Sequence, residues 1–177
     1  MLKKWMYTLV LTVLGASLAY AADNRPPGVP AQYDDDDNPT YYYALGDSGN
    51  VLYYEGEGEN RKPVYGWMDF ATYRGWRTYH AECHVCHGPD AAGSTFAPAL
   101  KDSLDYLDWE KFSDLIVNGK TEAQGAQVGN AMPAFGNNPN VMRDLENLYR
   151  YVRMRHEGKL RRGPRPPKLA KVEEVDE

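Results

Sequence analysis

The stretch Cys83-His84-Val85-Cys86-His87 decides the fold class of this chain. On a helix, it places two thiols and one imidazole at positions i, i+3 and i+4, which lie on one face. Two thiols with this spacing add to the two vinyl groups of a haem, and the adjacent imidazole then reaches the iron from the same side. Because the chain has only 2 cysteines, the motif predicts one covalently attached haem c.

Two other kinds of site use a cysteine pair. A thioredoxin-like redox pair needs only the two thiols and normally follows a strand, which the sequence does not predict here. A structural zinc site needs a second pair of ligands, and His80 and His84 are poorly placed to complete a tetrahedron. Haem attachment is the interpretation that uses all three residues of the motif.

The second axial ligand of the iron has to come from the opposite face of the haem. Met132 is favoured, because Pro133 and the glycines on either side let its loop fold tightly over a haem edge. We therefore expect the Met132 sulfur to bind the iron opposite His87. The alternatives are that Met132 packs in the core, or that another side chain binds the iron. The six candidates are Met68, Met132, Met142, Met154, His80 and His156.

The N-terminus has the features of an export signal. A basic start and an apolar run over residues 5–14 precede Ala19-Tyr20-Ala21, a small-x-small pattern that signal peptidase accepts. The apolar run is shorter than the roughly 20 residues that span a bilayer. We expect residues 1–21 to be a signal peptide, cleaved after Ala21, and the protein to be periplasmic. An uncleaved membrane anchor is the alternative, and it is the only membrane association expected.

Charge and composition define the flanking segments. The formal net charge of −5 among 177 residues argues against nucleic acid as a partner. Residues 22–39 contain four prolines and the acidic run 34–37, which is more typical of a solvated segment than of a calcium site. We expect 22–39 to be a flexible acidic segment and 158–177 to be a flexible, basic, proline-rich tail.

The middle of the chain predicts a small sheet followed by helices. Segments 40–45 and 51–54 are strand-like and tyrosine-rich, so we expect a β-hairpin extension over residues 40–66 that packs on the next domain. Residues 67–157 predict a mainly α domain. Its helices are expected over 69–82, over 109–118 between the cap Asp108 and the stop Gly119, and over 141–155. Three helices with long loops make a poor core alone, which agrees with a haem among them.

Several positions match a known family. Gly75 and Tyr79 precede the haem motif where that family has a glycine and an aromatic residue at a helix crossing, and Leu148 and Tyr151 match their partners on the last helix. Residues 67–157 therefore resemble the class I c-type cytochromes. The resemblance implies three or more helices wrapped around one covalent haem.

The resemblance also implies a role for one proline. Pro98 matches the proline whose carbonyl oxygen accepts the second N–H of the iron-binding imidazole. In this chain that imidazole belongs to His87. Such a hydrogen bond orients the ring and raises its basicity.

A narrower resemblance covers more of the chain. The tyrosine-rich hairpin, the segment 56–60 and Trp67-Met68-Asp69-Phe70 are similar to the methanol-metabolism cytochromes. These are relatives of cytochrome cL found with quinoprotein (PQQ) alcohol dehydrogenases. The resemblance implies an electron carrier and not an enzyme. It would take electrons from a PQQ-dependent methanol or alcohol dehydrogenase and pass them to a downstream c-type cytochrome or oxidase.

Two alternative functions stay open. The first is a general respiratory c-type carrier with another donor, and the second is a haem enzyme or gas-binding protein if Met132 does not bind the iron. Charged residues suggest two candidate surfaces, one of which would steer a partner: the acidic stretch 34–59 and a basic last helix. The alternative is that both are simply solvated faces. The basic residues of that helix region are Arg143, Arg150, Arg153 and Arg155.

Overall fold

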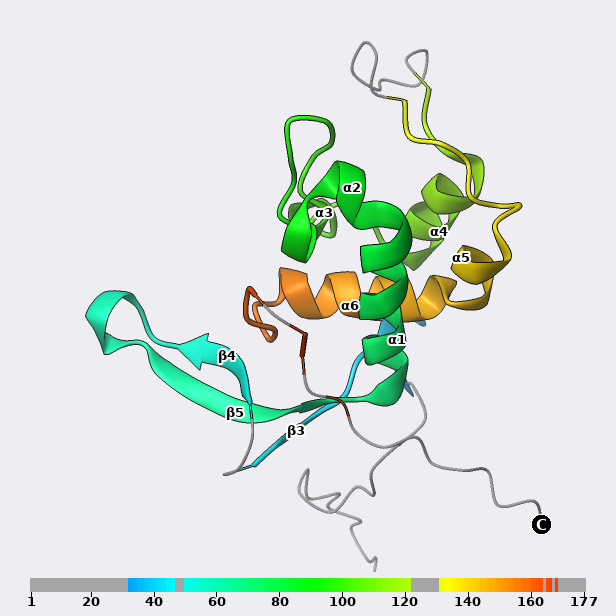
Figure 1. Cartoon of the computed structure of the whole chain (residues 1–177). Coiled ribbons are helices and arrows are strands. Elements are labelled where there is room, and N and C mark those ends of the chain that lie inside the picture. Colours follow the sequence, from blue (N-terminus) through cyan, green and yellow to red (C-terminus); the bar gives the residue numbers. More distant parts are fainter. Residues whose placement is uncertain (1–31, 47–49, 122–130, 164, 167, 169–177) are drawn as a thin grey trace, which may run out of the picture.

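Helices form the body of the molecule, and a small sheet projects from it (Figure 1). The computed structural model describes residues 32–46, 50–121, 131–163, 165, 166 and 168. The predicted signal peptide, residues 1–21, lies outside the described residues. In the part of the chain that the structure describes, no helix is both long enough and apolar enough to cross a membrane.

The predicted helices are present, with one break and one change of type. The helix expected over 69–82 continues from an α-helix into a π-helical turn, and the one expected over 141–155 is interrupted at Asp144. The helical elements are α1 Phe70–Thr78, the π-helix Tyr79–Cys83, α2 His84–His87, α3 Leu100–Ser103, α4 Trp109–Asn118, α5 Pro139–Arg143 and α6 Leu145–His156, with 3-10 turns at Gly58–Asn60 and Pro89–Ala91.

Aspartates fix where two of these helices begin. The Asp69 carboxylate accepts the Thr72 N–H at 2.8 Å at the start of α1, and Asp108 accepts the Lys111 N–H at 2.9 Å at the start of α4. Each carboxylate satisfies an N–H that the first helical turn leaves unpaired. Gly119, with a φ of 71°, ends α4 as predicted.

The core is built where α1 crosses α6. A Cβ on Gly75 would lie 1.7 Å from the backbone oxygen of Asn147, so only glycine allows the two backbones to approach so closely. Next to this contact, the buried rings of Tyr79 and Tyr151 lie 5.1 Å apart. The glycine and the aromatic pair thus stand at a helix crossing, as the resemblance implies.

The strands form two small sheets. β1 pairs with β2, and the other three strands form a sheet in the order β3-β5-β4 with antiparallel neighbours. The strands are β1 Gln32–Tyr33, β2 Pro39–Thr40, β3 Tyr43–Leu45, β4 Val51–Glu55 and β5 Lys62–Met68.

The predicted hairpin pairing is wrong. The two segments expected to pair with each other do form β3 and β4, but each pairs with β5, on opposite edges of it. Strand β5 has no clear strand pattern in the sequence, because Pro63 and Gly66 interrupt it. Gly66 nevertheless serves the sheet: a Cβ there would lie 2.2 Å from the oxygen of Ala44, so the glycine lets β3 approach.

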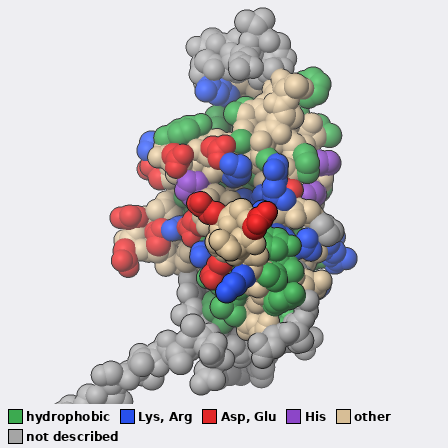
Figure 2. Space-filling view, turned by 90° about the vertical axis from the view of Figure 1, so that its left-hand side faces the viewer, with side chains coloured by type: hydrophobic (Ala, Val, Ile, Leu, Met, Phe, Trp, Pro, Cys, Tyr) green, Lys and Arg blue, Asp and Glu red, His purple; other side chains and the backbone are tan. Residues whose placement is uncertain are grey.

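Strands β4 and β5 form an arm that extends away from the helices (Figure 1). Tyr54 and Tyr65 on the arm are 42% and 40% exposed. The Arg61 guanidinium lies over the Tyr54 ring, 4.7 Å from its centroid. Figure 2, in which the arm points toward the viewer, shows acidic and basic side chains intermingled on this face.

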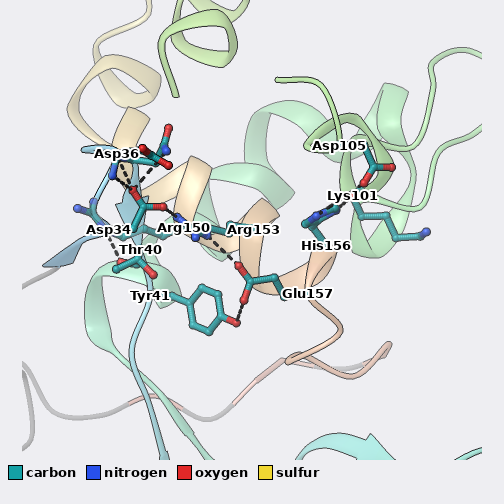
Figure 3. Close-up of polar contacts among 11 residues, drawn as sticks. Asp34, Asp36, Thr40, Tyr41, Lys101, Asp105, Arg150, Arg153, His156 and Glu157 are labelled. Atoms are coloured by element: carbon teal, nitrogen blue, oxygen red, sulfur yellow. Dashed lines mark hydrogen bonds and ion pairs between the residues drawn. The ribbon is translucent and has the colours of Figure 1, made fainter. Parts of the chain in front are cut away.

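The described part of the acidic segment is folded onto α6, unlike the flexible segment that we expected. β1 and β2 are joined by a turn in which the Asp34 carboxylate accepts the backbone N–H groups of Asp36 and Asn38 at 3.1 and 2.9 Å. The other oxygen of Asp34 binds Arg153 Nη1 at 2.6 Å (Figure 3). This carboxylate is therefore engaged by its own turn and by α6.

The described residues of the C-terminal tail are also held against the rest of the molecule, although we expected a flexible tail. We call the described residues among 159–168 the C-terminal strap. The Arg161 N–H donates to the Leu52 oxygen of β4 at 2.5 Å, and the Gly163 N–H donates to the Asp90 carboxylate at 3.2 Å. The strap thus connects the sheet to the turn that follows α2.

Candidate haem-binding site

The Cys-x-x-Cys-His motif lies on the π-helical turn and α2, immediately after the core contact of α1. Cys83 is buried and Cys86 is exposed, and no disulfide joins them. Burial, together with the nearby Glu82 and Cys86, raises the pKa of the Cys83 thiol to about 12. A redox-active pair needs a thiol with a lowered pKa. The environment of Cys83 therefore does not favour thiol–disulfide exchange.

His87 ends α2 with its ring buried and oriented by one hydrogen bond. Its Nδ1 lies 2.9 Å from the carbonyl oxygen of Pro98. The carbonyl can only accept, so Nδ1 carries the proton and Nε2 keeps its lone pair. Burial lowers the pKa of His87, and the bond to Pro98 opposes this effect only in part. The imidazole is therefore neutral near pH 7, the form in which histidine binds iron.

The loop between His87 and Pro98 is held tightly against α2. The Tyr79 hydroxyl donates to the Gly88 oxygen at 2.5 Å, and the Gly93 N–H donates to the His87 oxygen at 2.8 Å. Gly88 has a φ of 71°, and a Cβ there would lie 2.2 Å from the Gly93 oxygen. No role for Gly88 was predicted from the sequence. Its place directly after the motif is the only feature of the sequence that points to this role.

Met132 lies on a different element from the motif. Its backbone pairs with Lys120 through two hydrogen bonds of 2.9 and 2.8 Å, and its partly buried side chain packs against the core. The following residues also bind the end of α4, with the Phe135 N–H on the Ile116 oxygen at 2.9 Å. Figure 1 shows this segment (yellow) beside α4 and α5, apart from α2.

Gly119 lets the Met132 segment lie against the end of α4. A Cβ on Gly119 would lie 2.5 Å from the Met132 oxygen and 2.7 Å from the Ala134 nitrogen. From the sequence, Gly119 is only the residue that ends a helix. Its contact with the Met132 segment depends on tertiary packing and has no local sequence signal.

The other candidate ligands have different surroundings. Met68 and Met154 are fully buried, and Met142 is 38% exposed on α5. His80 Nδ1 contacts the Trp76 oxygen at 2.8 Å, and His156 Nδ1 contacts the Lys101 oxygen at 2.7 Å (Figure 3). Among the described residues, no group of three or more His, Cys, Asp or Glu side chains is arranged to hold a metal ion.

Comparisons with known proteins agree on one family. Residues 71–152 match the family model described as cytochrome c oxidase, cbb3-type, subunit III. Cytochrome c-553I of Paracoccus denitrificans is 47% identical over 103 residues, which are 58% of this chain but only 45% of that protein. Cytochrome c-555 of Methylococcus capsulatus is 34% identical over 92 residues, covering 51% of this chain and 68% of that protein.

A solved structure extends the match beyond the helical domain. The crystal structure of the c-type cytochrome XoxG from Methylobacterium extorquens AM1 is 43% identical, with a TM-score of 0.60, over 78% of this chain and 72% of that one. The chain is a class I c-type cytochrome. Its cofactor is covalently bound haem c.

The residues of this cytochrome fit a haem c. Cys83 ends the π-helical turn and Cys86 lies on α2, which also carries a neutral, buried imidazole whose Nδ1 proton is already engaged by Pro98. A thioether sulfur is held on a separate element, so it can approach from another direction. This set of donors is the one that a covalent haem with His and Met ligands requires.

Three of the four arginines expected to form a basic surface on the last helix of the cytochrome are engaged within the fold. Arg150 and Arg155 are buried, with 1% and 6% exposure. Arg153 forms ion pairs with Asp34 at 2.6 Å and Glu157 at 2.8 Å (Figure 3). These arginines therefore hold the fold together and are not available to steer a partner.

Proposed function

We propose that this cytochrome carries single electrons through one haem attached by Cys83 and Cys86, with His87 and Met132 as the axial ligands of the iron. The observation that carries the proposal is the 2.9 Å hydrogen bond from His87 Nδ1 to Pro98. It fixes the tautomer in which Nε2 is free to bind a metal, directly beside the two thiols. When bound, the haem supplies a one-electron Fe(III)/Fe(II) couple.

The protein contributes fixed positions for the two proposed iron ligands. Pro98 keeps the His87 ring oriented and makes Nε2 more basic. The pairing of Met132 with Lys120 holds the thioether segment in one position, and a neutral thioether in an apolar site favours the reduced state. Because the fold fixes both ligands, electron transfer requires little rearrangement.

We further propose a PQQ-dependent methanol or alcohol dehydrogenase as the electron donor, and a downstream c-type cytochrome or oxidase as the acceptor. The similarity to the c-type cytochrome XoxG, over most of both chains, supports this choice. The site lies in the periplasm if residues 1–21 are removed after Ala21. Mass spectrometry of the exported protein tests that cleavage.

Replacing Met132 tests the ligand assignment. We expect Met132→Ala to lose the weak red charge-transfer band of a sulfur–iron bond and to lower the reduction potential, because the thioether that favours reduced iron is gone. Met142→Ala is the matched control, since Met142 is exposed. The measurements are the optical spectrum of the ferric protein and a redox titration. A band that persists in Met132→Ala would show that another side chain binds the iron.

Stopped-flow mixing with reduced dehydrogenase tests the donor. The proposal predicts rapid reduction of the wild-type cytochrome by a purified PQQ-dependent methanol dehydrogenase with methanol. If ascorbate reduces the cytochrome and the dehydrogenase does not, the electron-carrier role stands and the proposed donor is wrong.

A further inference from the structure

Three arginines surround a surface pocket where α1 meets α5. The pocket has a volume of about 280 Å³. Arg74 and Arg77 come from α1 and Arg143 from the end of α5. The lining residues are Arg74, Arg77, Thr78, Ala81, Glu82, Asn140, Arg143 and Asp144. In a chain with a net charge of −5, such a concentration of guanidinium groups is an unusual local feature.

A buried carboxylate preorganises two of the three arginines. The Asp144 side chain is only 4% exposed, and it binds Arg74 Nη2 at 2.5 Å and Arg143 Nη2 at 3.3 Å. Asn147 Nδ2 also donates to it, at 2.9 Å. Its oxygens are therefore already engaged. The Arg143 side chain remains 61% exposed, so its other N–H donors are open to a ligand.

Arg77 is the pocket arginine whose positive charge is not paired with a carboxylate among the described residues. It lies one turn after Arg74 on the same face of α1 and is exposed. Within the described residues, no hydrogen bond or ion pair engages its guanidinium. Glu82, the other acid of the pocket, is held by Asn138 Nδ2 at 3.1 Å. The pocket thus has three guanidinium groups against two carboxylates, which leaves it with a net positive charge.

The position of the pocket connects it with the proposed haem ligands. Glu82 directly precedes Cys83, and Asn138 caps α5 at the end of the segment that begins with Met132. The contact between Glu82 and Asn138 joins these two segments at the edge of the pocket. A group bound here would therefore lie close to the place where an electron enters or leaves.

We propose that this arginine pocket binds an acidic side chain of the electron-transfer partner and orients the partner for docking. The inference rests on the proposed function, because it assigns that partner a contact point. A planar carboxylate matches the paired N–H groups of a guanidinium. The positive charge of the pocket also attracts an acidic surface over a distance and speeds the encounter.

Binding of a carboxylate probe tests the pocket without any partner enzyme. A short poly-L-glutamate peptide is titrated into the haem-loaded, full-length protein at low ionic strength and followed by amide NMR. We expect the largest shifts at Arg74, Arg77 and Arg143, and a loss of these shifts in Arg77→Glu. Arg162→Glu is the matched control, because Arg162 is an exposed arginine of the C-terminal strap. Shifts confined to other basic residues, or unchanged in Arg77→Glu, would overturn the proposal.

Electron-transfer rates test the docking role. Charge reversal in Arg77→Glu should slow reduction by a purified PQQ-dependent methanol dehydrogenase about ten-fold at low ionic strength, and the difference should shrink as salt is added. Arg143→Gln should give a smaller loss, and Arg162→Glu should match the wild type. Equal rates for Arg77→Glu and wild type would refute the docking role while leaving the donor established. If the peptide binds at the pocket but the dehydrogenase reduces neither the wild type nor any variant, carboxylate binding at the pocket is supported and the proposed electron donor is wrong.

Discussion

Gly119 controls whether the Met132 segment can lie where it does. Its φ of 71° is in the region that side-chain-bearing residues avoid, and its missing Cβ leaves room for the Met132 oxygen. The Cβ of any larger residue would lie within 2.8 Å of three backbone atoms of residues 132–134. The position of the proposed sulfur ligand thus depends on a residue that does not touch the iron.

Gly119→Ala tests this dependence. We expect it to destabilise the fold by about 2–3 kcal/mol, because backbone strain and overpacking add together. The sulfur–iron band should then disappear at a lower denaturant concentration than in the wild type. Gly136→Ala is the control in the same segment, where the nearest atom to a new Cβ lies at 3.0 Å. If the sulfur–iron band is half lost at the same denaturant concentration in Gly119→Ala and in the wild type, this dependence on Gly119 is wrong.

At the residue scale, the sequence predicted what local chemistry determines. The spacing of Cys83, Cys86 and His87 specifies a haem motif without knowledge of the fold, and the resemblance identified Pro98. The role of Gly119 and the burial of Arg150 could not be predicted. Both depend on residues distant in sequence, such as the Thr40 oxygen that accepts Arg150 Nε at 3.1 Å.

At the scale of elements, the β1–β2 turn is attached to α6 by one ion pair. Burial alone would raise the pKa of Asp34, but hydrogen bonds from Arg153 and the backbone outweigh that effect and leave the pKa lowered. A lowered pKa in the folded state means that the ionised carboxylate stabilises the fold. This stabilisation is present above the ordinary pKa of aspartate and is lost as the pH falls through the lowered value.

Asp34→Asn removes this charge and keeps an oxygen to cap the turn. We expect it to lower the free energy of unfolding by about 1 kcal/mol at pH 7, as for a partly exposed ion pair. The difference from wild type should shrink below about pH 4. Denaturant unfolding across that pH range is the measurement, with Asp36→Asn as the control for charge. A difference that is constant with pH would refute the ion-pair explanation.

The sequence predicted the helices more accurately than the strands and tails. Periodic apolar positions and the caps Asp69 and Asp108 define α1 and α4 locally. Strand β5 and the C-terminal strap have weak patterns of their own. They are ordered by backbone hydrogen bonds to distant segments, such as Arg161 to Leu52. Composition alone cannot reveal such partners.

At the scale of the whole molecule, separate elements hold the parts of the proposed site. The α1–α6 crossing lies next to the motif, one loop holds His87, and the end of α4 holds the Met132 segment. The strap fastens the sheet to the turn after α2. The fold is thus consistent with a body organised around a covalent haem, on which the proposed function depends.

The most direct test of the central claim is the mass of the purified, exported protein, measured after extraction with acidified acetone. The account predicts that the colour stays with the polypeptide and that its mass equals the processed chain plus one haem. The Cys83→Ser, Cys86→Ser double variant should lose both the colour and the added mass of the haem. A wild-type polypeptide that is colourless after extraction, with the haem in the organic phase, would contradict the account.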